Sequence, residues 1–418
     1  MTASARPLLL VIALALAACG ASDEPDEPNT LGPLPHYRIP GCEAYDTAPC
    51  DVRDAACQLR LMQIAVCLRQ DEPADLPPVS VVSETEYASI LTERVAGRAP
   101  TPNRDELEWA LSRFGLVMPG ALRDDAMVLY TATHIDGEFR PDMQDVLIID
   151  HGAKTDIAEA SNTLVHEFVH ALQYRELSDF GDGYVSTFDT HLALKSLIEG
   201  EARFHELRYR APMLGLDPRQ VDWERTFENG VSAAETWVLK QDSPFLAVTV
   251  LPYGWGSRLF SFDWNETGHA GVLARFADPP TTTHALMASV HAYEPDDFTA
   301  PDIALPELPS GWSAIGHEVF GAVGTFLVLA RYFTPDEARE LALAWRGDTF
   351  TVLQRTAQST NVGTVALWSV EFASEAAATS AASRITLTAL GTTRATGTRL
   401  TVVVSDRTTD VTWALPTE

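Results

Sequence analysis

The chain has 418 residues, enough for one large or two modest domains. Its hydrophobic content of 46% and aromatic content of 9% support a real core and exclude a chain that is disordered throughout. The formal net charge is -28. Because so acidic a surface repels phosphates, nucleic acid is not expected as a partner.

The first residues have the pattern of a secretory signal. Arg6 precedes an apolar run over residues 8–16, and small residues follow the run. The run is too short to span a bilayer as a stable helix. Residues 16–19, Leu-Ala-Ala-Cys, resemble the bacterial lipobox, in which the cysteine is lipidated and becomes the new N-terminus. We therefore expect a signal peptide over residues 1–18 and a lipid on Cys19; an ordinary signal peptide with an incidental cysteine is the alternative.

A lipid on this cysteine would attach an exported protein to a membrane without a transmembrane segment. In a Gram-negative cell, Gly20 after the cysteine favours the outer membrane by the usual sorting pattern. The acidic, proline-containing stretch that follows predicts a flexible tether over residues 19–40. The expected location is thus the bacterial cell envelope.

Four further cysteines lie within one short stretch: Cys42, Cys50, Cys57 and Cys67. Because an exported protein meets oxidising conditions, they predict two disulfides, and the three possible pairings stay open. A zinc cluster is the rival interpretation, but the stretch has no CxxC pair. Helical periodicity over residues 54–69 completes the prediction of a small disulfide-stapled helical hairpin over residues 41–75.

The next hundred residues alternate between short strand and helix patterns. The strands are expected over residues 79–82, 126–133 and 145–150, and the helices over residues 84–94 and 104–114. Ser83 is suited to cap the first of these helices. The last strand leads directly into the helix that carries the most informative motif.

That helix is expected over residues 157–177 and contains His166-Glu167-Phe168-Val169-His170. Residues four apart share one face of a helix, so the two imidazoles can reach one tetrahedral metal ion. Glu167 lies beside them, where a carboxylate can take a proton from the water that the metal activates. Burying these groups in so apolar a helix without a metal would be costly. The motif predicts a Zn²⁺ site; two hydrogen-bonded structural histidines are the alternative.

A catalytic zinc site needs a third protein ligand and keeps one position for water. A helix expected over residues 190–209 would bring a carboxylate back to the metal from an antiparallel direction. Its candidate ligands are Glu199, Glu201, His205 and Glu206. The three-histidine arrangement of metzincins is excluded, because Glu176 stands six residues beyond the second histidine.

The two helices together resemble the gluzincin arrangement of a HExxH motif and a glutamate. The segments HEFVHALQ and EGEA are similar to those of a group of uncharacterised bacterial metallopeptidases. In that pattern the glutamate before the glycine is the ligand, which implies Glu199. The glycine, Gly200, would then let its helix pack closely against the histidine helix.

Two later segments resemble the same group, so that the resemblance covers residues 140–370 in patches. Residues 251–282 resemble a PYxxG…PPxST stretch, and residues 345–348 resemble a GWGGD element. The chain departs from the group at Arg346, where glycine is usual, and at residues 282–284, where Ser-Thr-Glu is usual.

The resemblance also implies the parts that surround the metal. In zincin folds a sheet edge beside the histidine helix aligns an extended peptide by strand addition, and the strand at residues 145–150 suits that role by its position. Gluzincins commonly stabilise the oxyanion with a tyrosine or histidine, which indicates Tyr253, in an expected loop. An aromatic packing residue is the alternative for this tyrosine.

Two aspects of the site stay open in the sequence. His205, His284 and His291 are lesser candidates for the oxyanion donor. In thermolysin-like enzymes an aspartate four residues beyond the ligand glutamate supports a histidine ligand. Here that position is Arg203, so no residue is assigned to this support.

The rest of the chain has alternating helix and strand patterns. Helices are expected over residues 312–332, 335–345 and 375–383, and strands over residues 364–370, 384–389 and 400–404. We expect an α+β fold: a mainly helical, zincin-like catalytic domain over residues 78–375 with a small sheet beside the HExxH helix. A C-terminal helix and strands over residues 376–418 would pack on it.

These features predict a zinc metallopeptidase that hydrolyses peptide bonds outside the cytoplasm, with a peptide or protein as substrate. Zn²⁺ would be bound by His166, His170 and Glu199, and Glu167 would be the general base. One alternative is a non-catalytic surface binding or assembly lipoprotein that retains the fold, although such a protein has no need of Glu167. Another is a zinc hydrolase for a different amide, such as a cell-wall peptide.

Overall fold

The computed structural model describes residues 38–99, 101–152, 156–176, 187–355, 363–386, 390–406 and 412–415. The expected signal peptide, Cys19 and nearly all of the expected tether lie outside these residues. The described residues form a mixed α+β protein with two disulfides near its N-terminus. None of their helices is both long and apolar enough to cross a membrane.

The cysteine-rich stretch is one helix with a loop folded back on it. The helix α1 (Ala55–Arg69) begins after Asp54, whose side chain accepts a hydrogen bond from the backbone of Ala56. The disulfides join Cys42 to Cys67 and Cys50 to Cys57. A helical hairpin over residues 41–75 was expected, but residues 41–54 contain turns, bends and irregular chain and no helix.

A small sheet and four helices come next: β1 (Val79–Ser83), α2 (Glu84–Ala96), α3 (Arg104–Arg113), α4 (Asp124–His134), β2 (Gly137–Arg140), β3 (Asp145–Asp150) and α5 (Ile157–Glu176). The strand order is β1-β3-β2, with β1 parallel and β2 antiparallel to β3. The strand before α5 was expected at a sheet edge but is central, because its residues are buried from Val146 to Ile149. The edge strands are β1 and β2.

Helix α4 occupies residues that the sequence predicted as a strand. Its buried residues recur at helical spacing: Met127, Val128, Thr131 and Ala132. Leu129, in the same apolar run, is 65% exposed. A short apolar run fits either a buried strand or one face of a helix, and acidic residues in the first turn favour the helix here.

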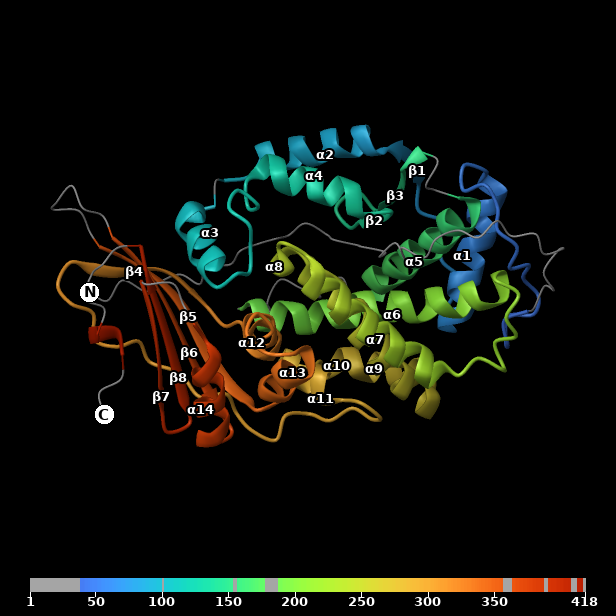
Figure 1. Cartoon of the computed structure of the whole chain (residues 1–418). Coiled ribbons are helices and arrows are strands. Elements are labelled where there is room, and N and C mark those ends of the chain that lie inside the picture. The colour runs from blue at the N-terminus through green and yellow to red at the C-terminus, as the bar shows by residue number, and fades with distance from the viewer. Residues whose placement is uncertain are drawn as a thin grey trace.

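The middle of the chain is helical: α6 (Phe188–Met213), α7 (Trp223–Lys240), α8 (Pro244–Ala247), α9 (Leu251–Thr267), α10 (His269–Ala277) and α11 (Thr283–Ala288). Helices α5 and α6 pack against each other in the centre of the molecule, and α9 packs on α6 (Figure 1). A Cβ atom on Gly200 would lie 2.3 Å from the backbone of Gly256. Gly200 therefore permits a close approach of α6 to α9, not to α5 as expected.

The C-terminal part contains β4 (Trp312–Glu318), α12 (Gly321–Leu329), α13 (Pro335–Leu343), β5 (Trp345–Arg355), β6 (Thr364–Phe372), α14 (Glu375–Arg384), β7 (Gly391–Thr396) and β8 (Arg399–Ser405). The five strands form an antiparallel sheet in the order β4-β5-β6-β8-β7. This sheet lies at one end of the molecule and α1 at the other (Figure 1).

Two expectations for this part are wrong. The helix expected over residues 312–332 is a strand followed by a helix, because Asp348 accepts the backbone N–H groups of Phe320 and Gly321 and so starts α12 there. No strand covers the described part of residues 384–389, and residues 387–389 lie outside the described residues.

Candidate metal centre

Helix α5 is buried between the small sheet, α1 and α6. His166 and Glu167 are fully buried, whereas 11% of the His170 side chain is exposed. The contacts between α5 and α6 run in opposite directions along the two helices. His166 contacts Glu206, whereas His170, one turn later in α5, contacts Glu199, two turns earlier in α6. This register makes the two helices antiparallel, as the sequence predicted.

Three ligand atoms converge between the two helices. The Nε2 atoms of His166 and His170 lie 3.0 Å apart. The Oε2 atom of Glu199 lies 3.4 Å from the first and 3.3 Å from the second. These residues form a group that could hold a metal ion, and they are the three that the sequence predicted.

The outer nitrogen of each imidazole has a hydrogen-bond acceptor. His166 Nδ1 lies 3.0 Å from the Glu206 carboxylate, and His170 Nδ1 lies 2.8 Å from Oε1 of Gln173. The Gln173 amide nitrogen donates to the backbone of Ile198 and to Glu201. These two hydrogen bonds turn the amide oxygen of Gln173 toward His170. Both Nδ1 atoms therefore carry the proton in the neutral rings.

The consequence is that both Nε2 lone pairs point at each other and at a carboxylate oxygen. Oε2 of Glu199 is buried and finds no hydrogen-bond donor among the described residues. Three acceptors in such proximity repel one another unless a metal ion or a proton lies between them. Two imidazole nitrogens and one carboxylate oxygen are a usual donor set for a catalytic zinc ion, so the residues present fit Zn²⁺.

The electrostatics of the centre also favour positive charge. Burial opposes protonation of His166, but the carboxylates of Glu199 and Glu206 outweigh it and raise its pKa to about 10. Burial alone would raise the pKa of Glu199, yet Lys195 and the two histidines hold it well below its usual range. Both carboxylates are thus ionised near neutral pH and attract a cation to the imidazoles.

Glu206 is the carboxylate that supports His166, a candidate ligand. The sequence assigned no residue to this support, because Arg203 stands where an aspartate was expected. Besides His166, Glu206 accepts a hydrogen bond from the Asn162 amide and pairs with the guanidinium of Arg203. Burial raises the pKa of Glu206, but the charge of Arg203 and the hydrogen bond from His166 outweigh this effect and lower the pKa to about 2. In the sequence Glu206 was a rival ligand; its seven-residue spacing from Glu199, two helical turns, is the signal for a supporting role.

Lys195 was not predicted. Its ammonium lies 3.6 Å from Oε1 of Glu199, one helical turn earlier in α6, and its side chain is almost fully buried. Holding one carboxylate oxygen leaves the other, Oε2, directed at the imidazoles. The four-residue spacing between the two residues was a signal for this pair in the sequence.

Glu167 is positioned by the edge strand β2. Its Oε2 accepts a hydrogen bond of 2.7 Å from the backbone N–H of Phe139. Its Oε1 is buried and has no hydrogen-bond partner among the described residues. Burial raises the pKa of this carboxyl, which makes it a stronger base than an exposed glutamate.

Tyr253 lies in helix α9 and not in a loop. Its ring stacks on the imidazole of His166 with 5.8 Å between the ring centroids and 23° between the planes. The helix reaches this position because Gly256 has no side chain: a Cβ there would lie 1.7 Å from the carbonyl oxygen of Ser196 in α6. The structure thus places Tyr253 beside the predicted ligands.

The other candidates have different surroundings. His284 contacts Asp296 and the backbone oxygen of Leu343, and His291 is exposed beside Glu224. His205 is buried 3.8 Å from Glu201. None of these three histidines belongs to the convergent group, and Glu201 faces Gln173 and Arg69.

A second group of possible ligands consists of Asp71, Glu176 and His269. Arg69 pairs with Asp71 at 2.6 Å and with Glu176 at 2.8 Å, and Arg175 pairs with Asp71 at 2.6 Å. Two guanidinium groups already neutralise these carboxylates. A further cation would meet their positive charge, so we assign no metal to this group.

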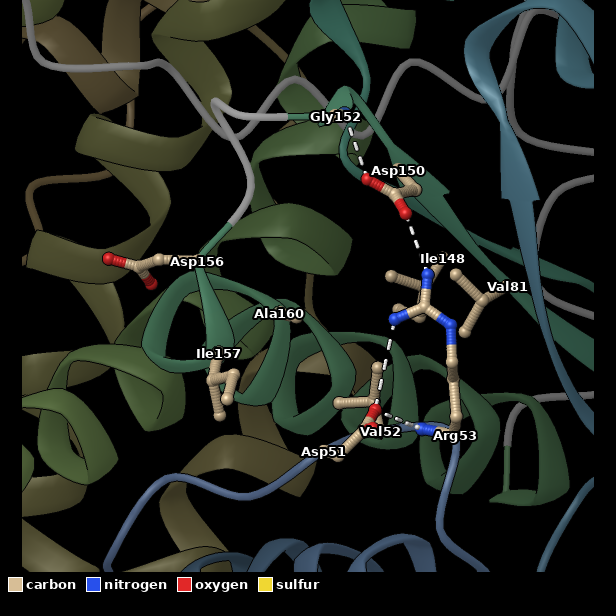
Figure 2. A pocket seen from close by; sticks show the side chains of 10 residues that line it. All are labelled: Asp51, Val52, Arg53, Val81, Ile148, Asp150, Gly152, Asp156, Ile157 and Ala160. Carbon is tan, nitrogen blue, oxygen red and sulfur yellow. Dashed lines mark hydrogen bonds and ion pairs between the residues drawn. The ribbon is translucent and has the colours of Figure 1, made fainter.

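A hollow of ≈ 320 Å³ lies between the start of α5, the small sheet and the loop before α1 (Figure 2). Arg53 reaches across it to Asp150 at 2.6 Å, and Asp150 also accepts the backbone N–H of Gly152 (Figure 2). None of the convergent ligands lines this hollow. Its charged groups are largely paired with one another.

Comparisons of the chain with protein-family models, curated proteins and solved structures found no match. The resemblance to gluzincin-type metallopeptidases therefore stays a prediction. The arguments for a function rest on the geometry of the centre.

Proposed function

We propose that this chain is a zinc-dependent metallopeptidase of the gluzincin type with a zincin-like fold. One observation carries the proposal: three acceptor atoms, from His166, His170 and Glu199, converge at 3.0–3.4 Å with a buried, partly unpaired carboxylate, Glu167, next to them in the sequence. A metal site used only for structure is closed by four protein ligands, whereas three ligands and a neighbouring base are typical of hydrolysis.

Each residue has a distinct role in this proposal. When bound, Zn²⁺ supplies a Lewis acid that lowers the pKa of water and polarises a carbonyl group. Glu167 uses Oε1, its oxygen without a partner, to accept the proton of the attacking water and then passes that proton to the leaving amine. The hydroxyl of Tyr253 donates a hydrogen bond to the oxyanion of the tetrahedral intermediate.

The substrate would lie along β2. This strand is an edge of the small sheet, and the N–H of Phe139 already points away from β3, toward Glu167. An extended peptide that pairs with an edge strand gains backbone hydrogen bonds without a requirement for one sequence. The edge beside the centre is therefore β2, instead of the strand at residues 145–150.

The two disulfides are compatible with an extracytoplasmic location. With the lipobox-like segment, they support the proposal that the protein is exported and anchored to the cell envelope through a lipid on Cys19. A membrane is then the expected partner of the N-terminus, and peptides outside the cytoplasm are the expected substrates. Mass spectrometry of the envelope protein tests the lipid: an unmodified N-terminus would contradict it.

Metal analysis and a peptidase assay test the function. The wild type should contain about one zinc ion per chain and cleave members of a mixture of unstructured peptides. Glu167→Gln should keep zinc and lose cleavage by about 10²–10⁴-fold, the usual contribution of a general base. A wild type that binds no zinc would contradict the proposal. Zinc without cleavage of any peptide would favour the binding lipoprotein, and cleavage restricted to cell-wall peptides would favour the other amide hydrolase.

A further inference from the structure

Arg69, the last residue of α1, is fully buried beside the metal centre. Its guanidinium donates to Glu201 at 2.6 Å, to Asp71 at 2.6 Å and to Glu176 at 2.8 Å. An unpaired charge at such a position would be strongly destabilising, so these carboxylates are needed to hold it there. Of the three, Glu201 is itself fully buried.

A chain of hydrogen bonds leads from this guanidinium to a metal ligand. Both oxygens of Glu201 are used: Oε1 accepts from Arg69, and Oε2 accepts from the amide nitrogen of Gln173 at 2.8 Å. Oε1 of Gln173 then faces Nδ1 of His170 at 2.8 Å. Each group in the chain fixes the orientation of the next.

The orientation of Gln173 decides whether His170 can bind a metal. With its oxygen toward the ring, the proton stays on Nδ1 and the Nε2 lone pair is directed at the ligand group. If the amide turned over, its NH₂ would face Nδ1 and favour a proton on Nε2, which then could not ligate. The Glu201 carboxylate and the backbone oxygen of Ile198 oppose that rotation, because both accept from the Gln173 nitrogen; of these two acceptors, Glu201 is the one that Arg69 holds.

Arg69 comes from a part of the chain far from the ligands. It lies 132 residues from Glu201 in the sequence, and Cys67, two residues before it, is joined to Cys42. Its helix α1 shares a hydrophobic core with α5, through residues such as Leu61 and Phe168. The disulfide-stapled segment is thus held against the helix of the metal ligands.

We propose that Arg69 is a positioning residue of the metal centre, which holds His170 in its metal-binding tautomer through Glu201 and Gln173. The disulfide-stapled segment would then be a part of the active centre. This inference rests on the proposed function, because it assigns a role to Arg69 at that same zinc site.

Zinc affinity, measured by competition with a chelator, tests this role in the full chain. Glu201→Gln offers one oxygen to two donors, so either Arg69 or Gln173 loses its acceptor. We expect Glu201→Gln and Arg69→Met to bind zinc about 10–100-fold more weakly, the usual effect of losing support for a ligand. The zinc affinity of Arg69→Lys should lie between the affinities of these two variants and that of the wild type. Arg175→Met is the matched control: it removes a guanidinium from the same ion cluster but leaves the chain to His170 intact, so its affinity should stay within about twofold.

Thermal unfolding of the metal-free proteins separates positioning from stability. A lower melting temperature with unchanged zinc affinity in Glu201→Gln would overturn the inference and assign Arg69 a structural role only. If Arg69→Met does not fold, Glu201→Gln and Arg69→Lys decide the question. A wild type that binds no zinc would refute the proposed function, whereas zinc binding that is insensitive to these substitutions would refute this inference alone.

Discussion

Substitution of Gly137 by alanine should separate metal binding from catalysis. Gly137 opens β2, directly over α5. A Cβ atom there would lie 2.5 Å from Cγ2 of Thr163 and 2.9 Å from Oε1 of Glu167. The first distance is about 1 Å shorter than a favourable carbon–carbon contact, so β2 or the two side chains must move.

The size of the effect follows from which group can move. Thr163 is β-branched and buried in a helix, so its rotamer is restricted, whereas Oε1 of Glu167 is the end of a longer side chain. We expect β2 to shift away from Thr163, Glu167 to be displaced, and the hydrogen bond from Phe139 to Glu167 to be weakened. Overpacking of this kind costs about 1–3 kcal/mol of folding free energy, and loss of a positioned base lowers kcat by about 10²-fold or more.

The assay compares kcat, zinc affinity and thermal stability of Gly137→Ala with those of the wild type. Zinc affinity should stay within about threefold, because the three atoms nearest to this Cβ position belong to Thr163 and Glu167 and not to a proposed metal ligand. Gly230→Ala is the control, since a Cβ there meets nothing within 4 Å. Adding Thr163→Ser should restore part of the stability but little of the kcat. Wild-type kcat in Gly137→Ala would refute the assignment of Glu167 as a base positioned by β2.

Three further substitutions test other parts of the structure. Glu206→Gln removes the charge that supports His166, so zinc affinity should fall about 10–100-fold in a chelator competition, and an unchanged affinity would contradict that support. Tyr253→Phe should lower kcat by about 10²–10³-fold with zinc affinity unchanged; equal turnover would make the tyrosine a packing residue. Burial raises the pKa of Asp189 to about 7, above its value in the unfolded chain. The neutral carboxyl therefore stabilises the fold at low pH, and this contribution is lost as the pH rises toward 7. Asp189→Asn keeps an acceptor for Thr283, so its stability in denaturant, relative to the wild type, should rise between pH 4 and 8 by up to about 4 kcal/mol; a pH-independent difference would contradict this.

The local elements around the centre could be predicted from the sequence. The helices near residues 55–69, 157–176 and 188–213 were predicted within a few residues of their observed bounds, because residues close together in the sequence favour a helix there. The i,i+4 spacing of His166 and His170 then places both imidazoles on one face. The resemblance to gluzincins added Glu199, and the structure brings it to the same point.

Errors arose where an apolar run is too short for its period to be informative, or where long-range contacts decide the conformation. The run that became α4 has too few residues for its period to distinguish a helix from a strand. The start of α12 depends on Asp348, which lies 27 residues beyond Gly321 in the sequence. No local pattern contains such a cap.

By itself, the sequence determined the chemical types and the spacing of the proposed metal ligands, and the presence of the cysteines that form two disulfides. Only the tertiary structure decided which groups support them: Glu206 behind His166, the edge strand β2 over Glu167, and Arg69 behind the Gln173 that faces His170. The physical reason is that spacing along one helix fixes a shared face. The partner of a buried charge or lone pair is set by how separate elements pack.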